Sequence, residues 1–384
     1  MEFKINKDNW ERVTLGDVVY EPKETAKDII AEGFEHIVGL EHIESGDVHL
    51  RNSFSIDTDT TFTKVFRAGD VLFGRRRAYL KKAAQAVFDG VCSGDITVMR
   101  ANDKLDVRLL PFVIHNDKFF DYAVKHSAGG LSPRVKFKDL ANYEFLLPPK
   151  AQQAELAELL WAMDTVIEKD LEVLERLVLL KESTISTYIS TIKKHKSLEQ
   201  IIDEVKGICF DGDWIESKDQ SQNGIRLIQL ADIGRGTFLN KSDKFISEET
   251  FVKLKCKGVF KDDLIIARMP EPIGRSCIIP ELNTKAITAV DCCILRIDDS
   301  EIREYLNSIF NTNFFENLCN QNASGTTRIR ISRKNLLKLS IPFDQSTIST
   351  LNEDLASIKA NVGQLASKLQ SSKTLQKALI NQVF

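Results

Sequence analysis

The feature that most constrains the fold of this 384-residue chain is an internal repeat at a shift of about half its length. The segment FRAGDVLFGR at 66–75 is similar to FKDDLIIAR at 260–268, and HSAGGLSPRVKFKDL at 126–140 is similar to QNASGTTRIRISRKNL at 321–336. Two further pairs, FEHIVGLEHIESGDV with GIRLIQLADIGRGTF and FLLPP with LSIPF, keep the same order. Because four similar segments recur in one order, the sequence predicts a tandem duplication of one domain.

Each copy is followed by a stretch in which apolar residues recur in steps of four and three. Residues 151–194 contain neither Gly nor Pro. The stepped positions are Leu156, Leu160, Met163, Ile167, Leu174 and Leu177 in the first copy, and Leu351, Leu355, Ile358, Val362, Leu365 and Leu369 in the second. This spacing is typical of a coiled-coil seam and predicts two long helices. We expect them to pair antiparallel; the alternative is two separate amphipathic helices, each lying on its own domain.

The segments before the two helices are typical of mixed sheets. Short apolar runs such as DVLFG, ITVMR, LIIAR and CCILRI are bounded by Gly, Pro, Asp or Asn, as strands usually are. Aromatic residues at helical spacing, such as Phe119 and Phe310, are expected in the cores. The predicted fold class is α+β: two tandem domains of mixed sheet and helices at 1–150 and 196–343, followed by long helices at 151–195 and 344–384.

Composition is that of a soluble globular protein. Charged residues make up 28%, no apolar run approaches the ~20 residues that cross a bilayer, and the first ten residues lack the apolar centre of a secretory signal. We therefore expect a cytoplasmic protein. The seven cysteines never stand in CxxC spacing, which favours reduced thiols over a disulfide framework or a zinc site.

The formal net charge of -3 conceals an uneven distribution of charged residues. Acidic residues outnumber basic ones in 1–50, and basic residues outnumber acidic ones in 51–150. Five of the eight residues from Arg75 to Lys82 are Lys or Arg. Because an anionic partner responds to the local surface and not to the total charge, the chain can present a positive face to such a partner.

Common catalytic motifs are absent from the sequence. It contains no GxxxxGK[ST], no GxGxxG after a strand, no GxSxG and no HExxH. Two short fragments resemble nuclease metal sites: Asp17 with Glu21-Pro22-Lys23, and Asp203 with Glu204-Val205-Lys206. A divalent metal needs carboxylates that converge from separated strands, and strings of this kind are common. A binding protein is therefore favoured, with a stand-alone DNA nuclease and a coiled-coil scaffold that does not bind DNA as the alternatives.

The order of the motifs resembles the specificity subunit of type I restriction-modification enzymes. The pattern runs W-x-x-V-x-L-G-D-V at 10–18, G-L-E-H-I-x-S-G at 39–46, G-D-V-L-F-G-R-R-R-A-Y-L-x-K at 69–82 and L-x-P before a Gln-rich helix start at 147–153, and then repeats. The resemblance covers essentially the whole chain. The sequence departs from the family where Gln152-Gln153 replaces the usual Glu-Gln and where the second copy reads IPFDQ. Both departures bear on how the helices start and how they meet a methyltransferase subunit.

In that family, each half is a target-recognition domain that reads one part of a bipartite DNA sequence, and the helices form the spacer between them. The resemblance implies a non-catalytic subunit that binds double-stranded DNA, two methyltransferase subunits and, for cleavage, restriction subunits. It implies no cofactor for this chain. S-adenosylmethionine, ATP and Mg are expected on the partner subunits.

The duplication suggests how candidate DNA-binding residues divide. If the two domains read different half-sites, residues common to both copies belong to the scaffold or bind phosphate, and base readers lie where the copies differ. Common features are Asp70 with Asp263, Arg75 with Arg268, and Gly130 with Gly325. Ser and Thr hydroxyls beside Arg and Lys suit phosphate oxygens. The candidate phosphate residues are Ser132, Arg134, Lys136, Thr326, Thr327, Arg328 and Arg330, together with Arg75 and Arg268 as possible common anchors.

Some candidates are particular to one copy. The back half of GDVLFGRRRAYLKKAA at 69–84 has no obvious counterpart in MPEPIGRSC, so Arg76, Arg77, Tyr79, Lys81 and Lys82 are expected to be specific to the first domain. The polar segments 51–64 and 239–257 also differ between the copies and carry side chains that can address base edges. For every candidate, an ordinary solvated surface is the alternative.

Overall fold

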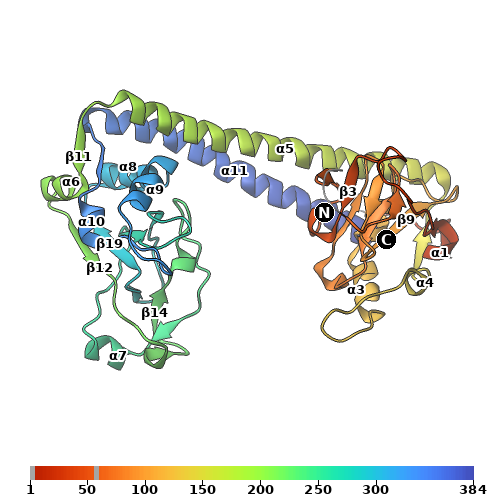
Figure 1. Ribbon diagram of the computed structural model, residues 1–384, viewed down its shortest axis with the longest axis horizontal. Coiled ribbons are helices and arrows are strands. Elements are labelled where there is room, and N and C mark those ends of the chain that lie inside the picture. Colours follow the sequence, from red (N-terminus) through yellow and green to blue (C-terminus); the bar gives the residue numbers. More distant parts are fainter. Residues whose placement is uncertain (1–4, 56–59) are drawn as a thin grey trace. The chain divides into compact units, whose positions relative to one another are not determined.

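The computed structural model describes residues 5–55 and 60–384. The chain forms two compact units (Figure 1). Unit 1 contains the chain up to Val173 and again from Leu365, and unit 2 contains Leu174–Gln364. Each unit therefore holds one globular part and a portion of each of the two long helices, α5 (Lys150–Thr191) and α11 (Gln345–Val383).

Unit 1 is built on two four-stranded sheets and a two-stranded ribbon. The first sheet has the order β2-β9-β6-β7 and is antiparallel, the second has the order β4-β3-β8-β5 with β3 and β8 parallel, and β1 pairs with β10. The strands are β1 (Glu11–Thr14), β2 (Val19–Tyr20), β3 (His36–Val38), β4 (Phe54–Ser55), β5 (Lys64–Phe66), β6 (Val71–Gly74), β7 (Ala83–Gln85), β8 (Gly90–Cys92), β9 (Ile96–Ala101) and β10 (Glu144–Leu147). The short helices are α1 (Leu15–Val18), η1 (Leu40–His42), η2 (Ala78–Leu80), α2 (Leu110–Ile114), α3 (Asp117–Lys125) and α4 (Phe137–Leu140).

Unit 2 has the same plan. Its sheets have the orders β12-β19-β16-β17 and β13-β15-β14-β18, β14 and β18 are parallel, and β11 pairs with β20. The strands are β11 (His195–Ser197), β12 (Ile208–Asp211), β13 (Gln220–Ser221), β14 (Ile225–Ile228), β15 (Phe245–Ile246), β16 (Leu264–Ala267), β17 (Ser276–Ile278), β18 (Ala286–Thr288), β19 (Cys292–Arg296) and β20 (Ser340–Pro342). The short helices are α6 (Leu198–Glu204), η3 (Ser217–Asp219), η4 (Leu230–Asp232), α7 (Glu248–Lys253), α8 (Ser300–Phe310), α9 (Asn313–Gln321) and α10 (Arg333–Leu337). The shared plan confirms the repeat.

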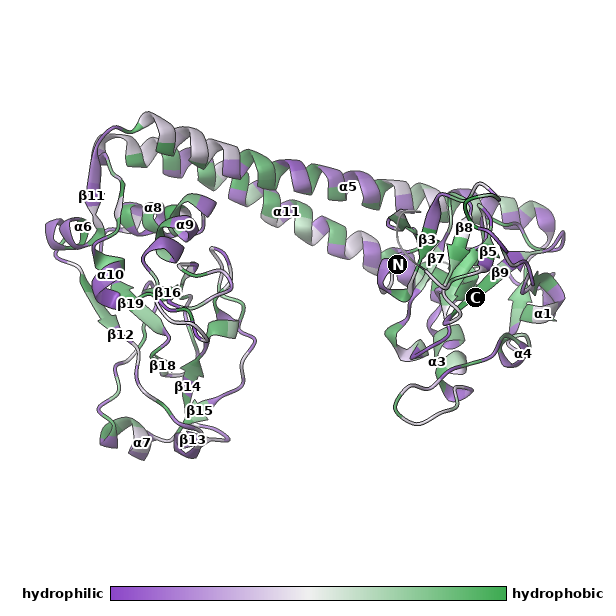
Figure 2. Ribbon diagram, in the orientation of Figure 1, coloured by the Kyte–Doolittle hydropathy of each residue, from purple (hydrophilic) through white to green (hydrophobic). Residues whose placement is uncertain are grey.

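Apolar residues gather on the strands and on the inner faces of the helices (Figure 2). The predicted core aromatics Phe119 and Phe310 are both buried. All seven cysteines are free thiols, and six of them are buried. Within the described residues, no helix combines the length and apolar character needed to cross a membrane.

The long helices pair antiparallel within each unit. In unit 1, Lys368 Nζ lies 2.9 Å from Asp170 Oδ1, and Gln376 Nε2 lies 3.4 Å from the carbonyl oxygen of Leu160. In unit 2, the hydroxyls of Tyr188 and Thr347 are 2.5 Å apart. Within unit 1, a residue later in α5 contacts a residue earlier in α11, so the two helices run in opposite directions. The expected antiparallel coiled-coil pairing is confirmed.

The helix ends also pack on the globular parts, as the alternative interpretation expected. Ala157 and Leu379 belong to the core of unit 1, and Ile185 and Leu351 belong to the core of unit 2. Each helix contacts its partner helix and also completes a domain core, so the two helices are not separate, although their ends do lie on the domains.

Gln152 and Gln153, where the sequence departs from the family pattern, hold the start of α5 in place. Gln153 is buried; its Nε2 donates to the carbonyl oxygens of Lys104 and Pro148, and its Oε1 accepts from the backbone N–H of Asp106. Gln152 Oε1 accepts from Trp10 Nε1 at 2.8 Å. The two amides therefore attach the first turn of the helix to the domain before it, since each satisfies polar groups that would otherwise be buried unpaired.

Candidate nucleic-acid interface

An ion pair in unit 1 organises the loop between α3 and α4. Arg134 Nε lies 2.7 Å from Asp95 Oδ1, and the backbone groups of Ala128 and Arg134 exchange two hydrogen bonds of 2.9 Å. The backbone N–H of Arg75 donates to the carbonyl oxygen of Asp95, and the N–H of Val135 donates to the carbonyl oxygen of Arg75. The loop is therefore closed on itself and attached to the residue that follows β6.

Two further arginines lie around this pair. Arg76 Nη1 is 3.4 Å from Asp95 Oδ2 and its Nη2 is 3.3 Å from the Ser132 hydroxyl, which is also 3.5 Å from Arg77 Nη2. The hydrogen bond from Arg134 lowers the pKa of Asp95, so this carboxylate stays ionised at neutral pH. We call Arg76, Arg77, Asp95, Ser132 and Arg134 the unit 1 patch. With three cations and one anion, it has a net positive charge, which suits a polyanion.

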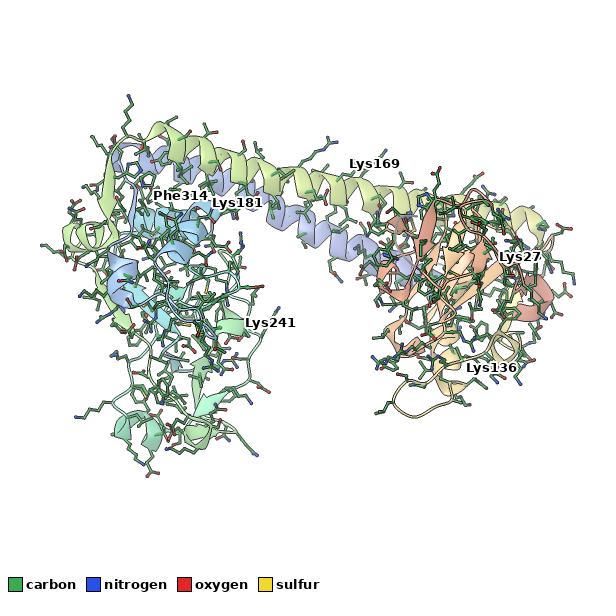
Figure 3. All side chains as sticks on the ribbon, in the orientation of Figure 1. Lys27, Lys136, Lys169, Lys181, Lys241 and Phe314 are labelled. Atoms are coloured by element: carbon green, nitrogen blue, oxygen red, sulfur yellow. The ribbon has the colours of Figure 1, made fainter. Side chains whose placement is uncertain are left out.

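Two other candidates are exposed. Tyr79 is on η2, and Lys136 is the residue before the first turn of α4 (Figure 3). Both side chains are accessible to a ligand.

Lys81 and Lys82, expected to bind DNA, each have a hydrogen-bond partner inside unit 1. Lys81 Nζ lies 2.7 Å from Asp117 Oδ1, and Lys82 Nζ donates to the carbonyl oxygen of Leu40 at 2.8 Å. In unit 2, Arg275 Nη2 donates to the equivalent carbonyl oxygen, that of Leu230, at 2.9 Å. The residues before them, Lys81 and Gly274, share a left-handed backbone with φ of 49° and 85°. The expectation that Lys82 has no counterpart is therefore wrong, because Lys82 and Arg275 occupy the same place and support the scaffold.

The second unit repeats the loop arrangement. The backbone N–H of Arg268 donates to the carbonyl oxygen of Asp291, and the N–H of Ile331 donates to that of Arg268. The backbone groups of Ser324 and Arg330 exchange two hydrogen bonds of 3.0 and 2.9 Å. Arg330 Nη1 lies 3.6 Å from Asp291 Oδ1. Asp291 and Arg330 thus correspond to Asp95 and Arg134, and Arg328 takes the place of Ser132. Thr326, Thr327 and Arg328 are exposed on this loop.

The hydrogen-bond register of the loop corrects the sequence-based pairing of Gly130 with Gly325. Ala128 and Ser324 are equivalent, so the residue that follows each of them is a glycine in both units. Gly129 and Gly325 share a left-handed backbone, with φ of 119° and 113°. Gly129, and not Gly130, is the counterpart of Gly325, because this turn needs a positive φ that residues with a Cβ rarely adopt.

Arg268 is a scaffold residue. Its side chain is 4% exposed, its Nη1 lies 3.0 Å from Asp211 Oδ1, and its Nη2 donates to the carbonyl oxygen of Val290. A phosphate cannot reach it without displacing these contacts. Arg75, its counterpart, is half-buried. Of the two roles that the repeat allowed for this pair, the scaffold role fits Arg268.

The two segments predicted to read bases have different surroundings. Residues 56–59 of the segment 51–64 lie outside the described residues, and at its ends Arg51 pairs with Asp47 and Glu168 while Lys64 pairs with Glu21. The segment 239–257 includes the exposed helix α7. The segment 239–257 is accessible to a ligand along much of its length.

The nuclease-like fragments have structural partners. Asp17 accepts hydrogen bonds from the backbone and hydroxyl of Thr14 at the start of α1, Glu21 pairs with Lys64, and Glu204 pairs with Lys196. In the part of the chain that the structure describes, no three His, Cys, Asp or Glu side chains are grouped so as to hold a metal ion.

Sequence reasoning missed Asp95, Asp291 and Trp214, a tryptophan that follows β12 and is 69% exposed. A fifth pair of similar segments, SGDITVMR at 93–100 and AVDCCILR at 289–296, would have indicated the two aspartates. Trp214 had no such signal, because the first copy has no tryptophan at the corresponding turn after β2.

Comparison with known proteins agrees with this architecture. No protein-family model matches the chain. A segment of 133 residues, 33% of the chain, is 31% identical to the EcoDI type I restriction enzyme specificity subunit of Escherichia coli, and the match spans 30% of that relative's length.

Two solved structures are similar over the whole chain. One, from work on complex assembly and conformational transition of the type I R-M system, is 20% identical with a TM-score of 0.62, and covers 100% of this chain and 99% of its own. The type I restriction-modification S subunit from M. genitalium is 15% identical with a TM-score of 0.56, and the match covers 100% of this chain and 98% of that one. The chain has the fold of these proteins, and the resemblance to specificity subunits is confirmed.

Proposed function

We propose that this chain is the DNA-specificity subunit of a type I restriction-modification complex, and that each unit reads one half of a bipartite target. The observation that carries the proposal is the recurrence of one loop arrangement in both units. Asp95 with Arg134 and Asp291 with Arg330 have the same backbone frame, yet the neighbouring side chains differ. Two similar sites with different surroundings are what a reader of two different half-sites needs.

The common and the different residues have separate roles in this proposal. Arg134 and Arg330 are common to the two sites and bind phosphate, which fixes each unit on the duplex without reading sequence. Arg76 and Arg77 belong to the first unit alone and contact base edges, where a guanidinium can form two hydrogen bonds to guanine. Ser132, Lys136, Thr326 and Thr327 add contacts to the DNA backbone.

The long helices set the gap between the half-sites and bind the partner subunits. Leu159, Val166 and Val173 follow one another at steps of seven on α5 in unit 1, and each is 45 to 47% exposed. Residues seven apart lie on one face of a helix, so these three form an apolar stripe. We assign this stripe to a helix of a methyltransferase subunit, because packing there would remove apolar surface from water.

The chemistry belongs to the partners. Methylating an adenine requires the base to leave the stack, which the methyltransferase subunits do with S-adenosylmethionine, while this chain holds the flanking duplex. ATP and Mg serve the restriction subunits. This chain is a non-catalytic subunit that acts in the cytoplasm and binds no cofactor of its own.

The proposal is tested by producing the chain together with a type I methyltransferase subunit from its native host. We expect the two to co-purify, native mass spectrometry to show two methyltransferase subunits per chain, and adenine methylation of duplex DNA to require both. Cleavage by the purified chain alone would support the nuclease alternative, and methylation by it alone would show that the chain is itself an enzyme. A chain that shows no salt-dependent affinity for duplex DNA, alone or in the complex, would support the scaffold alternative.

A further inference from the structure

The loop of unit 2 borders a hollow of about 550 Å³. Its lining includes Trp214, Glu216, Met269, Asp291, Arg328 and Arg330. Two of these, Asp291 and Arg330, are the counterparts of Asp95 and Arg134 in the unit 1 patch. The hollow therefore lies at the same place in unit 2 as the patch does in unit 1.

The side chains at equivalent positions of this place differ between the units. Arg76 directly follows Arg75, so its counterpart is Met269, which follows Arg268. Ser132 lies two residues before Arg134, so its counterpart is Arg328. An arginine beside a serine in unit 1 thus becomes a methionine beside an arginine in unit 2. The charge of Arg76 is moved across the site to Arg328, Met269 takes the position of Arg76, and Pro270 replaces Arg77, so unit 2 has one cation fewer here.

Trp214 forms the apolar side of the hollow. Its side chain is 69% exposed. An exposed indole leaves a large apolar surface in water, and this residue type is enriched where proteins bind partners. In unit 2, Trp214 and Met269 thus supply an apolar wall beside the cation of Arg328.

The backbone under Trp214 is firmly held. The N–H groups of Gly212 and Asp213 donate to the carbonyl oxygens of Cys292 and Thr288, and Asp213 Oδ2 accepts from the N–H of Lys257. A Cβ on Gly212 would lie 2.2 Å from the carbonyl oxygen of Ala289, which is a severe overlap, so only glycine fits there. The indole itself donates from Nε1 to Glu216 Oε1 at 3.3 Å. Such fixed support lowers the entropy cost of using the indole in binding.

From this difference in side chains between the units, we infer that Trp214, Met269 and Arg328 are the residues with which unit 2 discriminates bases in its half-site. The inference rests on the proposed function and names its specificity determinants. Arg328 suits the O6 and N7 atoms of guanine, and the wall of Trp214 and Met269 suits the methyl group of thymine. In unit 1, Arg76 stands where Met269 would be, so that unit lacks this part of the wall and reads another sequence at the same position.

The test maps methylated adenines in DNA modified by the complex of this chain with its methyltransferase. Wild type, Trp214→Ala, Trp214→Phe, Arg328→Ala and Arg76→Ala are compared. We expect Trp214→Ala and Arg328→Ala to reduce discrimination by about 5- to 100-fold at positions of one and the same half-site. Trp214→Phe keeps part of the discrimination, because an aromatic wall remains. Arg76→Ala relaxes the other half-site and leaves this one unchanged.

Phe260→Ala is the matched control. Phe260 is an aromatic residue of unit 2 with a similar exposed fraction, 60%, and its ring lies under the guanidinium of Arg296, outside the lining of the hollow. We expect this variant to keep the wild-type target. Thermal unfolding of each variant separates loss of fold from loss of reading.

Two results in which a variant differs from wild type would overturn the inference. One is a uniform fall in methylation at every sequence with an unchanged target, which would assign Trp214 to the DNA backbone. The other is relaxation of the half-site that Arg76→Ala relaxes. Failure of the proposed function looks different, since wild-type complex would then methylate nothing. A wild-type complex that methylates, with Trp214→Ala and Arg328→Ala indistinguishable from it, refutes this inference alone.

Discussion

Arg100 donates two hydrogen bonds to the buried carboxylate of Asp70, from Nε to Oδ1 at 2.7 Å and from Nη2 to Oδ2 at 2.8 Å. Arg296 and Asp263 form the same pair in unit 2, with both distances 2.7 Å. In both units the aspartate also accepts from the backbone N–H three residues before it. The aspartates common to the two repeats therefore hold the sheet to the turn that precedes β6 or β16.

Removing one of these carboxylates should destabilise its unit. Asp70→Asn removes the buried carboxylate that pairs with Arg100, which keeps the more exposed Glu24 as a partner, and we expect a loss of about 2 kcal/mol in the free energy of unfolding. Urea denaturation followed by circular dichroism measures it. Asp89→Asn is the control, because Asp89 pairs with Arg67 at the surface and should cost less than about 1 kcal/mol. Equal losses in the two variants would contradict the buried-pair account.

The contact between His49 and Asp164 should make the stability of unit 1 depend on pH. His49 Nε2 lies 2.6 Å from Asp164 Oδ2, and this hydrogen bond raises the pKa of His49 against the effect of burial. The carboxylates of Asp47 and Glu168 act in the same direction. Because the pKa is higher in the folded state, the contribution is fully present below the unfolded value of about 6.5 and is lost as pH rises through the folded value.

Thermal unfolding between pH 5.5 and 8.5, about one to two units on either side of that value, tests this dependence. The stability difference between wild type and His49→Gln should shrink as pH rises. His195→Gln serves as the control, since His195 is exposed in unit 2 and the pH dependence should persist. A difference that grows with pH would contradict the assigned sign.

Arg134 and Arg330 should contribute to affinity without contributing to specificity. Replacing either with Ala removes about one phosphate contact, so we expect the slope of log affinity against log salt to fall by about 0.9 for every duplex tested. Arg76→Ala and Arg77→Ala should instead alter the choice of the first half-site. Fluorescence anisotropy with labelled duplexes measures both effects. Arg108→Ala is the control, because Arg108 pairs with Asp106 outside both sites. A change of preferred sequence in Arg134→Ala would refute the phosphate role.

A charge on the apolar stripe of α5 should weaken binding of the methyltransferase subunit. In the double variant Leu159→Asp and Val166→Asp, two carboxylates would have to be buried unpaired, which costs several kcal/mol. We expect at least a 100-fold loss of affinity, measured by surface plasmon resonance with the methyltransferase in solution. Thr165→Asp places one such charge on the neighbouring face and should have little effect. Undiminished binding of the double variant would exclude the stripe as the docking site.

The sequence predicted the elements that follow from local periodicity and repetition. The steps of four and three marked Leu160 and Leu355, and both are buried where the helices pack. Repetition marked Asp70 and Asp263, and both hold arginines.

The sequence could not show which cations face solvent. Lys82 binds the carbonyl oxygen of Leu40, and Asp95 binds Arg134, through segments that only the fold brings together. A cluster of basic residues forms a positive surface only if its members have no partners inside the domain. Because such partners are distant in the sequence, the cluster alone does not reveal them.

The length of the gap in the methylated target tests the central claim most directly. One heptad is inserted in α5 after Val173 and another in α11 after Gln364, the boundary between the units. Seven helical residues add about 10 Å, close to three base pairs of B-DNA. We predict that the complex methylates the same two half-sites across a longer gap, by about three base pairs. Methylation across the original gap with undiminished preference would contradict the account.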